Sequence, residues 1–170
     1  MPKNHRTAAA HSQPDPWLIA AAAAIALIAA AIFLLHPPKL YAAGASGALV
    51  STAKTGLGRI LVDSSGRTLY LFGKDARGKS ACSGKCAGYW PPLITSGRPR
   101  AAGAAKPSLI GTTKRADGRL QVTYNHHPLY RFAQDTKKGQ THGEGIDAFG
   151  GHWYVVSPAG AAIKQGGGGY

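Results

Sequence analysis

The sequence Tyr70-Leu71-Phe72-Gly73-Lys74-Asp75 returns sixty residues later as Tyr130-Arg131-Phe132-Ala133-Gln134-Asp135. Residues 49–75 align without a gap onto residues 109–135, and ten of these twenty-seven positions are identical. A fixed offset held over this length indicates an internal duplication. We call the two halves copy one and copy two.

Short runs of β-branched, aromatic and leucine residues recur along both copies and predict strands. These runs are residues 49–53, 59–63 and 67–72 in copy one, and 120–124, 129–132 and 152–156 in copy two. A polar turn ending in Gly66 separates the last two runs of copy one, and Asn125 and Pro128 mark the corresponding turn of copy two. Each copy is therefore predicted to contain a β-hairpin.

The repeated motif also predicts which side chains are buried. Side chains alternate between the two faces of a strand, so the aromatic residues of both motifs are expected to face the core. They are Tyr70, Phe72, Tyr130 and Phe132. Arg131 stands where copy one has Leu71, so the opposite face is expected to be the wetter one.

The size of the copies predicts how they are organised. A copy of about fifty residues is too small for a secure core of its own. Copy one (48–96) and copy two (108–158) are therefore predicted to pack together as one all-β domain over residues 48–163. We expect a small sandwich or barrel-like meander with approximate internal two-fold symmetry. A loop would join the copies, and a glycine-rich tail, predicted to be disordered, would follow at 164–170.

An uncharged run of nineteen residues, Trp17–Leu35, precedes this domain. As a helix it would span about 28 Å, close to the thickness of a bilayer's hydrocarbon core. Its isoleucine, leucine and phenylalanine residues favour insertion, and it has no polar face of the kind that a surface helix carries. We expect one transmembrane helix at 17–35, after a cytoplasmic segment 1–16 and before a linker 36–47.

The flanking charges predict the orientation of this helix. Lys3 and Arg6 favour a cytoplasmic N-terminus, which would place the β domain on the extracytoplasmic side of the cell membrane. The alternative is secretion after cleavage near Ala45, because Ala43-Gly44-Ala45 has the small-x-small form of a signal peptidase site. The apolar run is longer than a usual signal core and ends well before that site, which favours the uncleaved anchor.

The composition is strongly basic. The formal net charge is +13, and from residue 41 onward 17 Lys and Arg stand against 6 Asp and Glu. Such a surface attracts polyanions, for example anionic lipid headgroups or wall polymers. It is equally consistent with a solvated surface that has no dedicated partner. Nucleic acid is not expected, since the basic residues are scattered and no reading motif is present.

The two cysteines, Cys82 and Cys86, have three residues between them, including Gly84. We expect a structural disulfide formed in an oxidising compartment. A c-type haem site would need a histidine directly after Cys86, and a thioredoxin-like Cys-x-x-Cys motif is also missing.

Asp75 and Asp135 end the two repeated motifs. As turn residues, their carboxylates would accept hydrogen bonds from nearby backbone N–H groups. The alternative is a pair that contacts a ligand across the two-fold axis. General acid–base catalysis would additionally need a cleft, which the sequence does not show.

Copy two is rich in possible metal ligands, which could hold a transition metal ion. These are His126, His127, His142, His152, Glu144 and Asp147. Their spacing fits no defined metal motif, so surface histidines without a cofactor are the first expectation. The sequence contains no phosphate-binding loop, nucleophile elbow or metalloprotease motif either, so we do not expect an enzyme.

Taken together, the motifs resemble a known family. The Tyr-x-Phe-x-x-Asp motif occurs twice, and Ser80–Pro92 (SACSGKCAGYWPP) follows the first occurrence. Over about residues 48–158 these features resemble the bacterial secreted repeats of unknown function, also described as predicted lipoproteins. The resemblance implies an extracytoplasmic, envelope-associated repeat protein whose biochemical function is not settled.

This chain has no cysteine near residue 45 that could accept a lipid, so membrane attachment would rest on residues 17–35. The function we expect is a non-catalytic envelope module, either binding or structural. A metal-binding or redox-associated protein that uses the histidines of copy two is the alternative.

The anchor hypothesis predicts that the mature protein keeps its first residues. Mass spectrometry of membrane-fraction protein is expected to recover peptides from residues 1–16, and the protein is expected to resist extraction by alkaline carbonate. A mature N-terminus at Ser46 would show instead that the protein is secreted after cleavage.

Overall fold

The structure is a computed structural model that describes residues 47–164. The predicted transmembrane helix, the segments on either side of it up to residue 46, and the tail from residue 165 lie outside the described residues. Within residues 47–164, no helix has the length and apolar character needed to cross a bilayer.

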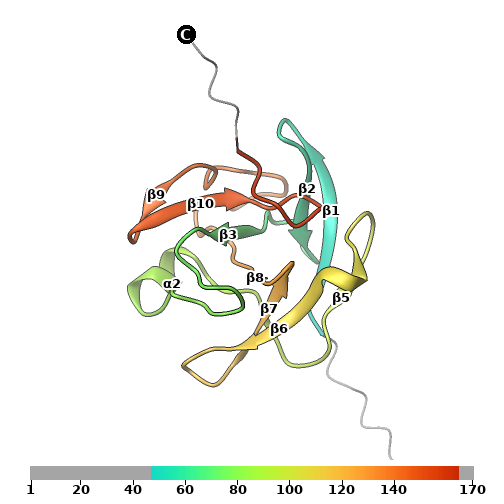
Figure 1. Cartoon of the computed structure of the whole chain (residues 1–170). Coiled ribbons are helices and arrows are strands. Elements are labelled where there is room, and N and C mark those ends of the chain that lie inside the picture. Colours follow the sequence, from blue (N-terminus) through green and yellow to red (C-terminus); the bar gives the residue numbers. More distant parts are fainter. Residues whose placement is uncertain (1–46, 165–170) are drawn as a thin grey trace, which may run out of the picture. The chain divides into compact units, whose positions relative to one another are not determined.

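Each copy contributes one long antiparallel hairpin (Figure 1). In copy one, β1 (Leu49–Thr55) pairs with β2 (Gly58–Asp63), and in copy two β6 (Ile110–Lys114) pairs with β7 (Leu120–Tyr124). The strands predicted at 49–53, 59–63 and 120–124 are thereby confirmed. The main partner of β2 is the preceding strand rather than the following one, to which it is joined only by a bridge between Val62 and Thr68.

Short strands extend these hairpins. β5 (Arg100–Ala101) pairs in parallel with β1, while β4 (Ile94–Thr95) and β8 (His127–Pro128) both pair with β7. Two helical turns interrupt the sheets: α2 (Lys85–Tyr89) and the 3₁₀ turn η1 (Pro107–Leu109).

A third sheet joins the two copies. β3 (Tyr70–Phe72) from copy one pairs with β10 (Gly151–Val155) from copy two, and β10 also pairs with β9 (Asp147–Ala148). The reverse exchange also occurs, because Arg131 and Ala133 of copy two donate backbone hydrogen bonds to Pro91 and Tyr89 of copy one. The motif of each copy is therefore paired with the other copy. The strand predicted at 129–132 is not formed, because Tyr130 takes part only in isolated bridges there.

The all-β class with two tandem repeats is confirmed, but the sheets of the described region do not close into a barrel. They remain three separate small sheets, ordered β2-β1-β5, β3-β10-β9 and β4-β7-β6. Proline and glycine residues interrupt the chain between them, notably at Pro91-Pro92 and Gly97-Arg98-Pro99, and keep strands such as β4 and β5 only two residues long.

An aromatic core lies where the copies meet. Phe72, Trp153, Trp90 and Phe132 form one continuous stack, with successive ring centroids 4.0, 3.9 and 4.3 Å apart. Tyr70 packs edge-on against Trp90 at 5.4 Å, and its counterpart packs edge-on against Trp153 at 5.1 Å. The prediction that the motif aromatics face the core is confirmed.

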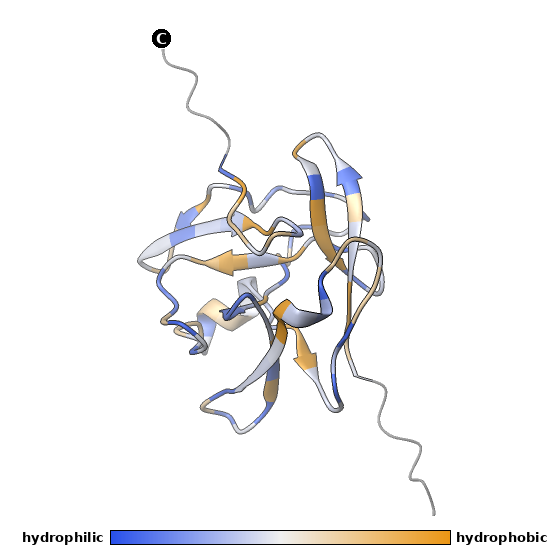
Figure 2. Ribbon diagram, turned by 45° about the vertical axis from the view of Figure 1, so that its right-hand side comes forward, coloured by the Kyte–Doolittle hydropathy of each residue, from blue (hydrophilic) through white to orange (hydrophobic). Residues whose placement is uncertain are grey.

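A second, aliphatic core lies on the other face of the motif strands, formed in part by Leu61, Leu69, Leu71, Leu93, Val122, Leu129 and Val156. The hydrophobic segments accordingly concentrate on strands, and the loops are mostly hydrophilic (Figure 2). The prediction of a wetter face holds only in part. Leu71 is 6% exposed, whereas Arg131 in copy two is partly exposed. In copy one both faces of the strand are covered.

The tight packing of the aromatic core predicts the effect of Gly143→Ala. A Cβ atom there would lie 2.8 Å from Trp90 Cη2 and 2.9 Å from Tyr70 Cε1, and both rings are held by their neighbours. The overpacked variant is expected to lose about 1–3 kcal/mol of unfolding free energy in urea titrations followed by circular dichroism. Gly88→Ala is the matched control, because its Cβ meets nothing within 4 Å and it lies in α2. Equal stabilities of the two variants would contradict this account.

Candidate functional site

The repeated motif brings two tyrosines together at the centre of the domain. The backbone of Tyr70 donates a hydrogen bond to the carbonyl of Tyr130 at 2.8 Å, and Tyr130 returns one at 3.0 Å. Both residues are fully buried. Because the equivalent residues of the two copies bond each other reciprocally, this pair marks the approximate two-fold axis of the domain.

The motif side chains exchange partners across the same axis. The hydroxyl of Tyr70 donates to Asp135 Oδ2 at 2.5 Å, and the hydroxyl of Tyr130 donates to Asp75 Oδ2 at 2.8 Å. The other carboxylate oxygen of each aspartate accepts a backbone N–H from the following loop, from Ala81 at 2.7 Å and from His142 at 3.0 Å. The predicted turn role is therefore present, and each aspartate also holds the tyrosine of the other copy.

Burial sets the protonation of these groups. Burial, reinforced by the facing carboxylates, raises the pKa of both tyrosine hydroxyls above their usual range, so Tyr70 and Tyr130 stay neutral donors. Burial also raises the pKa of Asp75 to about 6, although the Ala81 N–H, Tyr130 and Arg115 favour its charged form. Asp135 has no exposed surface, so a substrate could not reach its carboxylate in this arrangement.

A buried polar network surrounds Asp75 in copy one, and the sequence did not predict it. Arg115 donates from Nη1 to Ser80 Oγ at 2.8 Å and to Gln121 Oε1 at 2.6 Å, and from Nη2 to the carbonyl of Cys82 at 2.7 Å. Ser80 Oγ in turn lies 2.7 Å from the Tyr130 hydroxyl. The network therefore connects the arginine of copy two to the motif aspartate of copy one.

The alignment of the two copies shows a difference at two residues of this network. Arg115 and Gln121 occupy the positions of Thr55 and Leu61 in copy one. A charged residue in place of threonine and a polar one in place of leucine indicate that the copies differ locally, but not that the two residues bond each other.

A second unpredicted contact also crosses between the copies. Arg131 Nε donates to Asp63 Oδ2 at 2.5 Å. Burial of Asp63 opposes ionisation, but its hydrogen bonds with Ser65, Arg131 and the Arg67 N–H prevail and hold its pKa below the usual value. The arginine that replaces Leu71 thus serves as a link between copies.

The expected disulfide is present between Cys82 and Cys86, whose Cα atoms lie 5.3 Å apart. Both cysteines are buried against the aromatic core, and α2 begins just before the second one. The backbone N–H of Trp90 bonds the carbonyl of Cys86 at 2.8 Å, so the cross-linked loop positions this tryptophan in the stack.

The structure does not gather the histidines of copy two into one cluster. His142 Nδ1 lies 3.3 Å from Asp135 Oδ1, and His152 Nε2 lies 4.0 Å from Asp147 Oδ2. Glu144 accepts the backbone N–H of Val155 at 2.6 Å.

The other two histidines follow β7. His126 lies in the turn, where its carbonyl accepts a hydrogen bond from Gly78, and His127 begins β8. In residues 47–164, no three His, Cys, Asp or Glu side chains are grouped as a metal ion would require. Metal binding stays a prediction that elemental analysis can test.

Both copies are recognised by the same family model. A model described as a secreted repeat of unknown function matches residues 51–94 and 111–157, which together make up more than half of the chain. No curated protein and no solved structure shows a detectable match to this chain.

The raised pKa of Asp75 predicts a pH dependence of stability. The contribution of this carboxyl is fully present below the unfolded-state pKa of 3.8 and is lost as the pH rises through the folded-state value of about 6. Asp75→Asn stays neutral, so between pH 4 and pH 7 its unfolding free energy should fall less than that of the wild type. Urea titrations across this range measure the difference.

Asp63→Asn is the control with the opposite sign. The lowered pKa of Asp63 stabilises the fold above pH 3.8, and that contribution is lost as the pH falls through the folded-state value. The unfolding free energy of Asp63→Asn should therefore rise less than that of the wild type as the pH increases from acidic values. Curves for Asp75→Asn and wild type that stay parallel would refute the assignment of the raised pKa.

Proposed function

The chain belongs to the family of secreted repeats of unknown function, and we propose that it is a non-catalytic envelope module. In this proposal, residues 17–35 hold it at the outer face of the cell membrane, where the β domain presents a basic surface to polyanions. The observation that carries the proposal is the different location of its acidic and basic side chains: most acidic ones are bonded within the domain, and most basic ones are exposed.

Most of the acidic groups are used inside the domain. Asp75 and Asp135 hold the two tyrosines, Asp63 bonds Arg131, and Glu144 bonds a backbone N–H. The basic side chains are mostly on the surface. The exposed ones are Lys54, Arg59, Lys74, Arg77, Lys79, Lys85, Arg98, Arg100, Lys106, Lys114, Arg119, Lys137, Lys138 and Lys164. The exterior field is therefore positive, which favours binding to polyanions.

The use of the motif residues supports a role without catalysis. Both aspartates are fixed by a tyrosine and a backbone N–H, and both tyrosines are neutral donors to them. An acid or base catalyst must instead exchange a proton with a bound substrate. Holding the two copies together is thus a sufficient role for the motif tyrosines and aspartates.

The linker supports a position close to the membrane. Residues 36–47 could extend at most roughly 40 Å, so the domain would stay in the zone next to the headgroups and the inner part of the wall. In this zone each basic residue near an anionic surface contributes about 1 kcal/mol of attraction, which salt weakens.

The proposal is tested with the intact protein in nanodiscs of phosphatidylcholine, which carries no net charge. Titration with polyglycerol phosphate is expected to show binding at low ionic strength that weakens as salt is added. Dextran, a neutral polymer, is the control and should not bind. Absence of polyanion binding at low salt would mean that the basic surface is only solvated.

Elemental analysis of untagged protein provides an independent outcome. Stoichiometric copper, zinc or iron that is lost in a His142→Ala/His152→Ala variant would favour the metal-binding alternative and count against this proposal.

A further inference from the structure

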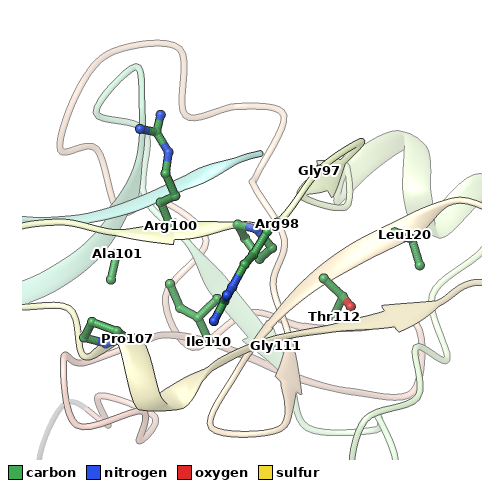
Figure 3. A pocket seen from close by; sticks show the side chains of 10 residues that line it. Gly97, Arg98, Arg100, Ala101, Pro107, Ile110, Gly111, Thr112 and Leu120 are labelled. Atoms are coloured by element: carbon green, nitrogen blue, oxygen red, sulfur yellow. The ribbon is translucent and has the colours of Figure 1, made fainter. Parts of the chain in front are cut away.

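A groove of about 750 Å³ lies between β5 and β6, each at the edge of its sheet (Figure 3). Its lining combines apolar and basic side chains: Pro107, Ile110 and Leu120 with Arg98 and Arg100. Leu120 is 41% exposed. No acidic residue of the described region lines the groove. The groove is therefore amphipathic and positively charged.

The two arginines are placed differently. Arg98 reaches across the groove toward Ile110, whereas Arg100 points outward from the rim (Figure 3). Both side chains are exposed, and within residues 47–164 neither guanidinium forms an ion pair with a carboxylate. Both charges are therefore available to an external anion.

The groove also lies where the N-terminal tether enters the domain. Gly47, the first described residue, packs so closely on the Arg98 backbone that a Cβ atom there would lie 1.8 Å from its carbonyl oxygen. The carbonyl of Ala48 accepts the backbone N–H of Arg100 at 2.8 Å. The predicted membrane helix ends at Leu35, so only a linker of at most roughly 40 Å separates the bilayer from this side of the domain.

We propose that this groove binds the headgroup of an anionic phospholipid. The phosphodiester would contact Arg98, whose side chain lies across the groove, and Arg100 at the rim would add positive charge, since a guanidinium matches the oxygens of a phosphate in geometry and charge. The glycerol and upper acyl carbons would pack on Pro107, Ile110 and Leu120. The inference rests on the proposed function, because the anchor brings lipid to the groove.

The test compares the intact protein in two kinds of nanodisc. One contains phosphatidylcholine alone, and the other contains phosphatidylcholine and phosphatidylglycerol in equal amounts. Amide hydrogen exchange in residues 97–101 and 107–112 is expected to slow several-fold when phosphatidylglycerol is present. In Arg98→Ala/Arg100→Ala the docking equilibrium constant should fall roughly 30-fold, the equivalent of about 1 kcal/mol for each arginine, and the slowing should disappear.

Lys54→Ala/Arg59→Ala is the matched control. It removes the same charge from two exposed residues that face each other across the β1–β2 hairpin, away from the groove lining. It should keep the slowed exchange. Equal loss in both variants would mean that net charge alone attracts the domain, and would overturn the groove site.

Two further outcomes separate this inference from the proposed function. A protein that fails to insert into nanodiscs would refute the anchor, and co-sedimentation of the same variants with phosphatidylglycerol vesicles would then test the groove alone. If polyglycerol phosphate slows exchange in the groove and phosphatidylglycerol does not, the lipid assignment is wrong while the polyanion-binding function stands.

Discussion

The hydrogen bonds between the tyrosine of each repeat and the aspartate of the other are the constraint on which this domain depends. A buried carboxylate such as Asp135 is strongly unfavourable unless donors surround it, and its partners are the Tyr70 hydroxyl and a loop N–H. The donor comes from the other copy, and the backbone of each motif also bonds to the other copy. Neither copy can satisfy its own buried polar groups alone, which explains in physical terms why the unit is a pair.

The two copies reach the same central stack by different local means. Copy one positions Trp90 with a disulfide-linked loop and the short helix α2, whereas copy two positions Trp153 within β10. Arg115 supports a polar network near Asp75 in copy one. Asp135 in copy two has no such network, and His142 from the following loop lies next to it instead. The symmetry therefore holds for the motif and its rings, and gives way in the loops that support them.

This interior also shapes the exterior. Because carboxylates are committed to tyrosines, an arginine and backbone groups, the lysines and arginines on the surface are left largely without compensation. The loop that joins the copies adds Arg98 and Arg100 beside an apolar strand edge, next to Gly47, the first described residue. The proposed roles in polyanion and lipid binding both follow from this division between a self-satisfied interior and a basic surface.

The sequence by itself determined the features that depend on local pattern. The gap-free repeat revealed the duplication, alternation revealed most of the strands and the buried motif aromatics, and the short spacing of Cys82 and Cys86 revealed their bond. Only the tertiary structure decided which groups meet, since Tyr70 and Asp135 are 65 residues apart and no local pattern encodes such a pairing. For the same reason Leu71 is buried and Arg115 is internal: the residues that cover them come from distant segments, and burial is a property of packing rather than of sequence neighbours.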